Sequence, residues 1–596
     1  MRELDYPFDA DYIIEHKKKL RKQLLQDGSQ RNLVRIAILG GSTTKDIVDI
    51  LELFLLNYGI EAQFYESEYG QYYQDAVYPN LRLEDFRPDI IYICTSNHNI
   101  GRYPSIGDSA ETVNEMVTSE LDKFEGIWEQ LNKKYNCPII QNNFELPYYR
   151  LMGNRESYDI HGAVNYVTRL NMEFYQYAQK CNWLYICDLN YISSDYGLRK
   201  WSDPWYWYMY KYAVALTAIP YLSFNVANIV KSLMGKNKKG FVLDLDNTLW
   251  GGVIGDDGVD NIELGQEEPV GQAYLEFQRY IKAHQQLGII LNINSKNDYE
   301  NAMTGIRHPD SLFSEKDFIS IKANWNPKDV NLRDIAEELS LLPESLVVLD
   351  DNPAERHLIK EQFPLVQTPE LSEAAYYIGE VDRAGYFEVT ALSDDDLKRN
   401  EMYQTKQLQI KEQKAFASYG DYLMSLNMKA YIRPFETVYM ARIAQLTNKS
   451  NQFNLTTKRY MQREIEEIAD SDEYITLYGR LMDRFGDNGV VSVVIGHIEE
   501  NVCHIELWLM SCRVLKRDME YAMMDMLVKR CLDRGIKIVK GYYYPTMKNA
   551  MVKNFYELMG FKKTLENENG NTEWSLDIAQ EYNTKNHYIE QVEEIE

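Results

Sequence analysis

The sequence contains no C-x-x-C pair, and its seven cysteines are odd in number. We therefore expect reduced thiols, as in a cytoplasmic protein, rather than a disulfide framework. The N-terminal residues contain no apolar signal segment. The least polar window, residues 212–230, is interrupted by Pro220, Ser223, Asn225 and Asn228. It predicts a buried helix and loop rather than a membrane span.

Positive charge is also scarce, because 64 Lys and Arg residues face 90 Asp and Glu residues, which gives a net charge of -26. Binding to nucleic acids or membrane surfaces needs a positive field, so neither is expected. A local basic pocket for a phosphorylated ligand remains compatible with this balance. The content of 45% hydrophobic and 26% charged residues is typical of a globular protein. A chain of 596 residues is too long for one core and predicts three or four domains.

The chain is organised around residues 241–258, which read FVLDLDNTLWGGVIGDDG. The three apolar residues at the start predict a short strand buried in a parallel sheet. Asp244 and Asp246 follow directly, and Thr248 lies two residues further on. Ligands of open α/β sheets bind at the carboxyl ends of strands, so this stretch predicts a functional site.

Strand and helix patterns alternate through residues 236–385, which predicts an α/β domain with a Rossmann-like parallel sheet and a small cap. A glycine-rich and acidic excursion at 249–268 separates the first strand from the next helix. A fifth strand is expected near 365–367. Polar residues follow each of the other strands, namely Asp244 and Asp246, then Ser295 and Lys296, then Lys328, then Asp350 and Asp351.

The D-x-D-x-T run resembles the signature of the haloacid dehalogenase (HAD) superfamily. The longer run DLDNTLWGGVIGDDG resembles its FkbH-like branch, as do LDDNPAER, NKSNQFNLTTKRY, DRFGDNG and SCRV. The resemblance implies that Asp244 attacks phosphorus to form an aspartyl-phosphate, and that Asp246 protonates the leaving oxygen and later activates water. It further implies that Ser295 and Lys328 hold the phosphoryl oxygens.

A magnesium ion is implied as well, held by Asp244, the backbone carbonyl of Asp246, Asp350 and Asp351. Thr248 and Lys296 are further candidates for substrate binding. Lys296 and Lys322 compete with Lys328 for the lysine role, although the run Asn326-Pro327-Lys328 matches the family better. Arg356 either binds substrate phosphate or pairs with an acid.

Residues 1–235 predict a flavodoxin- or SGNH-like α/β domain. A strand at 35–40 followed by Gly-Gly-Ser-Thr resembles SGNH hydrolases, in which a nucleophilic serine follows the first strand. The D-x-x-H pair of that family is missing, because the corresponding place reads Asp203-Pro204-Trp205-Tyr206. Serine needs a base, so Ser42 is interpreted as a helix N-cap or an anion-binding residue.

Residues 386–426 predict a solvent-exposed helical connector, and 581–596 an acidic tail that is frayed over 590–596. Residues 427–580 resemble a GNAT acyltransferase, an α+β fold, with a closing F-Y-x-x-x-G-F run. The coenzyme A loop of that family has glycines where this chain has Lys516 and Asp518 after Arg513, so coenzyme A is not expected. The fold is expected instead to receive a carrier's pantetheine arm. Arg513 is a candidate for substrate binding, and Asn451 belongs to the polar run 448–457, which either lines the tunnel for that arm or caps two elements.

The FkbH-like resemblance covers nearly the whole chain and implies a specific reaction. Such proteins take a glyceryl unit from 1,3-bisphosphoglycerate, lose phosphate and load the acyl group on an acyl carrier protein. Cys512 is the candidate acyl relay, and a buried structural cysteine is the alternative interpretation. A plain phosphatase acting on a small sugar or glycerol phosphate and a scaffold without turnover remain the other hypotheses.

Overall fold

The computed structural model describes residues 1–29, 31–413, 416, 418–450, 452–546, 548–579 and 582–592. The chain forms two compact units. The first contains Met1–Lys236 and Glu388–Ala391, and the second contains Asn237–Phe387 and Leu392–Glu596. The expected division of the second unit into separate domains stays a prediction. Within the described residues, no helix has the length and apolar character needed to cross a membrane.

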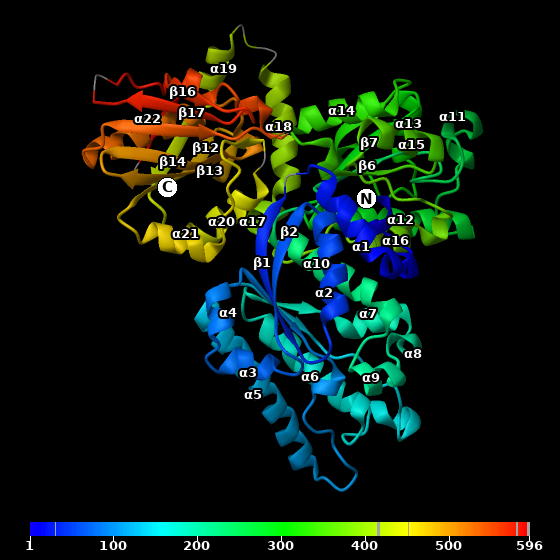
Figure 1. The fold of residues 1–596 in the computed structure, drawn as a ribbon. Helices are drawn as coiled ribbons and strands as arrows, with labels where there is room; N and C mark the ends of the chain where they lie inside the picture. Colours follow the sequence, from blue (N-terminus) through cyan, green and yellow to red (C-terminus); the bar gives the residue numbers. More distant parts are fainter. Residues whose placement is uncertain are drawn as a thin grey trace. The chain divides into compact units, whose positions relative to one another are not determined.

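The first unit is built on a five-stranded parallel sheet with the order β2-β1-β3-β4-β5 (Figure 1). This is the order of flavodoxin-like folds, as the sequence predicts. On one face, aromatic residues of α5 (Ala110–Tyr135) and α6 (Ala163–Ala178) pack against the apolar strand residues. The strands are β1 (Asn32–Gly40), β2 (Ile60–Glu66), β3 (Ile90–Cys94), β4 (Ile139–Asn142) and β5 (Leu184–Cys187).

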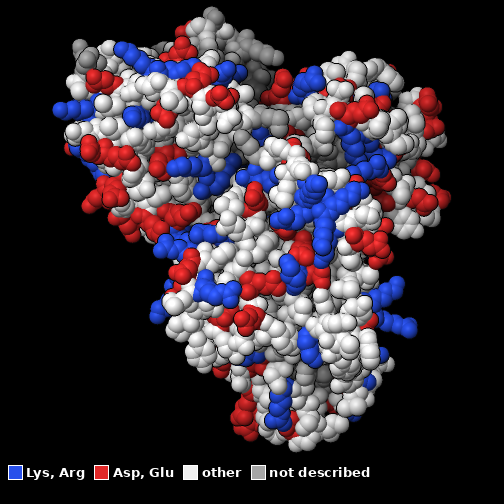
Figure 2. All heavy atoms as spheres, viewed as in Figure 1, with Lys and Arg blue, Asp and Glu red and all other residues white. Residues whose placement is uncertain are grey.

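Three further helices of this unit pack on one another. α2 (Lys45–Asn57) lies between α1 (Ala10–Gln26) and α10 (Ile219–Leu233). Figure 2 shows Lys and Arg side chains gathered over α1, on a face where acidic and basic residues otherwise alternate. The positive charge is therefore local, in keeping with the acidic balance of the chain.

A second parallel sheet carries the central part of the chain, with the order β8-β7-β6-β9. The strands are β6 (Gly240–Leu243), β7 (Ile290–Ser295), β8 (Phe318–Ala323) and β9 (Leu346–Leu349). The expected fifth strand is reduced to a single bridge between Val347 and Gln367, so that prediction is wrong. In the expected cap, α11 (Ile254–Asp257) lies within the loop after β6, and Gly251 pairs with Glu263.

The connector is not the exposed spacer that its composition suggests. In α18 (Arg399–Gln413), Tyr403 and Gln409 are buried, and Tyr403 belongs to the apolar core under the second sheet. The Lys406 ammonium donates to the Leu339 carbonyl and to the Ser340 hydroxyl. These three residues lie about one turn apart, so they form one anchored side of the helix. The helix is polar in overall composition, and composition alone does not indicate this anchored side.

The C-terminal part forms a nine-stranded mixed sheet with the path β16-β17-β15-β14-β13-β12-β10-β18, and β11 pairs with β14. β14 and β15 run parallel but pair only from Val502 to His504. The strands are β10 (Met428–Arg433), β11 (Phe453–Asn454), β12 (Tyr474–Asp483), β13 (Gly486–Glu499), β14 (Val502–Met510), β15 (Ile538–Tyr543), β16 (Lys562–Glu566), β17 (Thr572–Asp577) and β18 (Ile589–Gln591).

The expected acidic tail is not frayed throughout. β18 adds to the sheet beside β10, and the Ile589 side chain is buried there. Asp525 accepts hydrogen bonds from the backbone of Lys585 and Asn586, which fixes the approach to the strand. Net acidity indicates a solvated tail, but one buried isoleucine and edge pairing are enough to order these residues. The rest of the expected tail, at 581 and 593–596, lies outside the described residues.

Candidate active site

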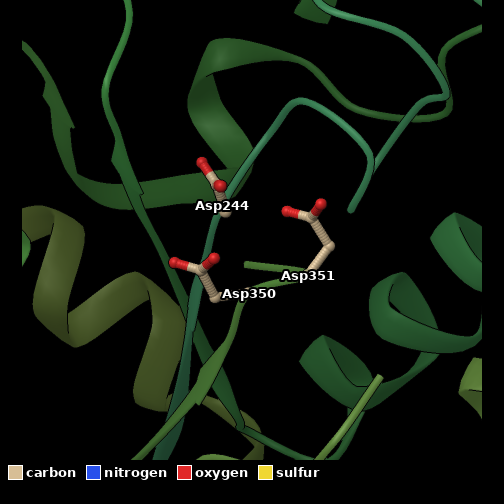
Figure 3. Close-up of side chains that lie close together, drawn as sticks. All are labelled: Asp244, Asp350 and Asp351. Carbon is tan, nitrogen blue, oxygen red and sulfur yellow. The ribbon is translucent and has the colours of Figure 1, made fainter. Parts of the chain in front are cut away.

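Three carboxylates meet at the carboxyl ends of two neighbouring strands. Asp244 follows β6, and Asp350 and Asp351 follow β9. Leu243 pairs with Leu349 in the parallel register, so the two strands end at the same level. The carboxylate oxygens of the three residues lie within 4.8 Å of one another. Figure 3 shows Asp350 and Asp351 projecting toward the end of β6 that bears Asp244.

A buried lysine joins two of these carboxylates. Lys328 is the first residue of α14 (Lys328–Leu339), and its ammonium lies 2.7 Å from Asp244 and 2.6 Å from Asp350. Burial by itself would lower the pKa of Lys328, but the two carboxylates raise it, so the ammonium stays charged. Burial and then the neighbouring Asp244 raise the pKa of Asp350 to about 6.

Asp246 is held by three donors from the loops around it. The indole of Trp250 donates to its carboxylate at 2.9 Å, and the backbone N–H of Ile254 donates at 3.2 Å. The Asn297 side-chain amide donates to the other oxygen at 3.2 Å. Burial raises the pKa of Asp246, whereas the Trp250 and Ile254 donors oppose that rise. A carboxyl group with this environment is suited to taking up and releasing a proton.

The electrostatics of the cluster favour a divalent cation. Asp244, Asp246, Asp350 and Asp351 supply four carboxylates against the one ammonium of Lys328, a formal excess of three negative charges. Magnesium binds oxygen ligands at about 2.0–2.1 Å, so ligands on opposite sides of the ion are about 4 Å apart. The 4.8 Å spread of the three carboxylates is within a small adjustment of that value. The donor set therefore fits magnesium.

The remaining expected residues of this site are placed differently from one another. Ser295 ends β7 and is buried. Thr248 is also buried, and its hydroxyl accepts the N–H of Asp351 at 3.3 Å, which supports the loop after β9. Arg356 donates to the backbone carbonyls of Asp350 and Asp351 at 2.6 Å. This contact is neither the pairing with an acid nor the binding of substrate phosphate that the sequence suggests. Their roles toward a substrate stay predictions.

Two competing lysines are engaged elsewhere. Lys296 is paired with Glu355 at 2.6 Å, and Lys322 is paired with Glu338. Lys328 is thus the one of the three whose ammonium contacts Asp244. The substrate contact proposed for Lys296 stays a prediction.

Sequence reasoning missed the groups that hold the cluster in place. Trp250 lies inside the run DLDNTLWGGVIGDDG and Asn297 directly follows Lys296, but no sequence pattern indicates the contact of either with Asp246. Asn331 donates to Asn294, and Asn294 donates to the carbonyl of Lys328 at 2.8 Å, which fixes the start of α14. A buried asparagine beside a catalytic motif was the available signal, because such a side chain must find partners.

Cys512 lies at the opposite edge of the second sheet. It is partly exposed and lines a pocket of about 110 Å³ together with Lys239 and Ser345, which precede β6 and β9. Its side chain packs against the core that contains Tyr403. Arg513 lines the same pocket and donates to the Ser511 hydroxyl at 3.2 Å. Because the four residues of β6 span about 13 Å, this pocket is remote from the carboxylates.

The loop after Arg513 keeps a backbone that glycine ordinarily favours. Lys516 and Asp518 have φ values of 66° and 61° in the left-handed region. Their side chains occupy the positions that glycines occupy in the coenzyme A loop, so the expectation of no coenzyme A stays open to test. Asn451, the other candidate here, lies outside the described residues.

In the first unit, Ser42 is buried after β1, but the N-cap of α2 is Thr44, so the N-cap interpretation of Ser42 is wrong. His98 stacks on Trp207 with ring centroids 3.8 Å apart, and His161 contacts Asp159 at 2.7 Å. Asp203 caps the helix α9 (Pro204–Tyr210). Among the described residues, no hydrogen bond joins Ser42 to either histidine. An SGNH-type hydrolase site remains unsupported.

Comparison with known proteins finds similarity in both units. Residues 35–231 match the family model "FkbH, N-terminal domain". The N-terminal part of protein BF1531 from Bacteroides fragilis, containing a phosphatase domain and complexed with Mg, is 29% identical with a TM-score of 0.59. That match covers 63% of this chain and 99% of the other. No curated protein sequence matches the chain.

The C-terminal region matches acetyltransferases only distantly. A GNAT-family acetyltransferase from Streptococcus pneumoniae is 14% identical with a TM-score of 0.21, over 25% of this chain and 99% of the other. The GNAT-like interpretation of this region stays a prediction.

Proposed function

We propose that the central part of this chain is a magnesium-dependent phosphatase of the HAD type. The observation that carries the proposal is the convergence of Asp244, Asp350 and Asp351 within 4.8 Å beside Lys328. The similarity to a phosphatase domain complexed with Mg, at 29% identity, supports the same reaction class and the same ion. A small phosphorylated compound is the substrate.

The residues divide the phosphoryl transfer between them. An Asp244 oxygen attacks phosphorus and forms the aspartyl-phosphate, while the bond from phosphorus to the leaving oxygen breaks. Lys328 and Ser295 hold the phosphoryl oxygens. Asp246 gives its proton to the leaving oxygen and then removes a proton from the water that hydrolyses the aspartyl-phosphate. Magnesium bound to the carboxylates supplies positive charge that offsets the repulsion between nucleophile and phosphate.

The finer proposal concerns the compound and its fate. An acyl phosphate of the 1,3-bisphosphoglycerate kind would lose phosphate, and its acyl unit would be loaded on an acyl carrier protein in the cytoplasm. In the transfer, the Cys512 sulfur forms a bond to the acyl carbon, the carbon–oxygen bond to phosphate breaks, and inorganic phosphate leaves. The thiol proton passes to solvent. The carrier's pantetheine thiol then displaces Cys512 from the thioester.

The position of Cys512 in a pocket, partly exposed, supports the finer proposal over a structural cysteine. A plain phosphatase on a sugar or glycerol phosphate is the second candidate. It is favoured by the separation of Cys512 from the carboxylates, because a phosphatase needs only the carboxylate edge.

One experiment separates the two candidates. Protein, Mg²⁺, 1,3-bisphosphoglycerate and a phosphopantetheinylated carrier are incubated, and intact masses are recorded. A glyceryl adduct on the carrier that disappears with Cys512→Ser supports loading, whereas phosphate release without any adduct supports the plain phosphatase. Phosphatase turnover that survives Asp244→Asn would remove both. Asp256→Asn, an exposed carboxylate in the loop after β6, is the matched control and keeps its activity.

A further inference from the structure

The pocket around Cys512 has a charge that contrasts with the rest of the chain. Among the described residues that line it, five side chains are cationic and one is a carboxylate. The cations come from the second sheet, the connector and the C-terminal sheet domain, all within the second unit, and are Lys239, Arg399, Arg442, Lys449 and Arg513. A formal excess of four positive charges around one pocket stands out in a chain of net charge -26.

Asp396, the carboxylate among the described lining residues, pairs with two of these cations. Arg399 donates to it, and the Lys449 ammonium lies 3.3 Å from it. Burial would raise the pKa of Asp396, but Lys449 and Arg399 outweigh burial and hold it at about 2. Asp396 is therefore fully ionised, and its charge is shared between two cations.

Lys239 is the cation that most clearly requires a partner. It immediately precedes β6, and its backbone N–H donates to the Ser345 carbonyl, while no hydrogen bond or ion pair of its ammonium is found among the described residues. Burial lowers its pKa, the neighbouring Cys512 opposes this effect, and Arg399 and Arg513 lower the pKa further. Burial together with Arg399 and Arg442 likewise lowers the pKa of Lys449 to about 8, against the pull of Asp396. An anion entering the pocket would relieve these costs.

The chemistry of the lining selects the anion. Arginine presents several N–H groups in a plane that matches phosphate oxygens, and the Ser340, Ser345, Ser450 and Ser511 hydroxyls add neutral donors. A doubly charged phosphate with several acceptor oxygens can accept more hydrogen bonds from these donors than a carboxylate can, and it offsets more of their positive charge. The pocket volume of about 110 Å³ is enough for several water molecules, so a phosphoryl group with a short carbon chain fits it.

We propose that this pocket is a second phosphate-binding site, which takes the phosphoryl group of a small organic phosphate and holds its carbon chain against Cys512. The inference deepens the acyl-transfer step of the proposed function by giving Cys512 its substrate class. It does not depend on hydrolysis at Asp244, because the two sites lie at opposite edges of the sheet.

Protection of Cys512 from alkylation tests the site in the full chain. Inorganic phosphate is titrated against iodoacetamide, and labelling is read by peptide mass spectrometry. At a phosphate concentration about ten times its Kd, alkylation of Cys512 slows about tenfold. Cys181, the other partly exposed cysteine, lies in the first unit and serves as the internal reference. Sodium chloride at equal ionic strength is the control for screening.

Variants show which side chains are responsible. Lys239→Met and Lys449→Met each weaken the protection, with Kd for phosphate rising about tenfold for each lost charge-assisted contact. Lys562→Met, at an exposed position of β16, leaves Kd unchanged. Circular dichroism checks that the variants fold, and a failure of one lysine variant to fold leaves the other to decide.

Asp244→Asn separates this site from the phosphatase. Protection that persists in Asp244→Asn supports the second site, even if no phosphatase activity is found in the native protein. Protection that is absent, that sodium chloride reproduces, or that is lost in Asp244→Asn overturns the inference while leaving the phosphatase proposal to its own assay.

Discussion

The Lys328 ammonium lies 2.7 Å from Asp244 and 2.6 Å from Asp350, so one buried cation ties the proposed nucleophile to a proposed metal ligand. The three residues reach this point from the ends of three elements, β6, β9 and α14. The lysine limits the repulsion between two carboxylates that would otherwise face each other in a buried site.

Lys328→Met should lower kcat about a hundredfold or more, because a group that holds the charge of the transition state is lost. It should also lower the melting temperature, since removing one partner of a buried ion pair costs about 3–5 kcal/mol. Turnover of p-nitrophenyl phosphate and thermal unfolding measure the two effects. Lys322→Met, whose ammonium pairs with Glu338 instead, is the control. A native kcat in Lys328→Met would contradict the assignment.

Trp250→Phe should move the alkaline limb of the pH–rate profile of kcat/KM upward by about one unit. The indole donates to Asp246 at 2.9 Å and opposes the burial that raises the pKa of that group. Without the donor the pKa rises further, so Asp246 keeps the proton that it gives to the leaving oxygen up to a higher pH. The profile of kcat/KM from acid to alkaline pH measures the shift. Trp325→Phe removes a matched indole contact to Asp298 on the surface and should leave the profile unchanged.

Removing magnesium should destabilise the second unit. The ion offsets the excess negative charge of the four carboxylates, and at 100 times its Kd it adds about 2.7 kcal/mol to the free energy of unfolding. Thermal unfolding with MgCl₂ and with EDTA measures the difference. Asp351→Asn should reduce that difference, whereas Asp256→Asn should not. An equal response of native protein and Asp351→Asn would exclude Asp351 as a ligand.

Glu145→Gln should stabilise the first unit increasingly as the pH rises from about 4.5 to 7, and the gain should stay constant at alkaline pH. Glu145 is buried, accepts the N–H of Asn97 at 3.2 Å, and has its pKa raised to about 7 by burial. The pKa of Glu145 is about 4.5 in the unfolded chain and about 7 in the folded one, so the protonated carboxyl group favours the folded state. This contribution to stability is complete below pH 4.5 and is lost as the pH rises through 7. The neutral amide avoids that loss, which is at most about 3 kcal/mol. The melting temperatures of the native protein and of Glu145→Gln should lie close together at pH 5 and further apart at pH 8.5.

The matched control for this effect is Glu115→Gln, at an exposed position of α5. Its melting temperature should follow that of the native protein at both pH values. An equal gain for Glu145→Gln at pH 5 and pH 8.5 would contradict the raised pKa.

The site could be predicted from the sequence where local pattern determines geometry. An apolar strand followed by Asp244, and another followed by Asp350, must bring both carboxylates to one edge of a parallel sheet. The contact of Trp250 with Asp246 depends on the path of a loop, and no periodic pattern specifies such a path. The same holds for Arg356, whose partners are backbone carbonyls and therefore carry no sequence signal.

The fold was predictable to a similar depth. Alternating strands and helices specify both parallel sheets, whereas the tail and the connector depend on single apolar contacts of Ile589 and Tyr403. The sequence indicates Cys512 as a candidate. Its position beside Lys239, at the amino end of β6, follows from tertiary packing between distant segments. Composition averages over such contacts and cannot report them.

The length of β6 separates the carboxylate site from the Cys512 pocket, so a substrate that reacts at both sites must visit them one after the other. Lys239 and Asp244 flank this four-residue strand and lie five residues apart, about 16 Å, which is more than a three-carbon phosphate can bridge. Whatever is formed at one edge must travel before it meets the other. Escape into bulk water then competes with onward transfer, and the yield of the second step depends on how fast the intermediate is recaptured.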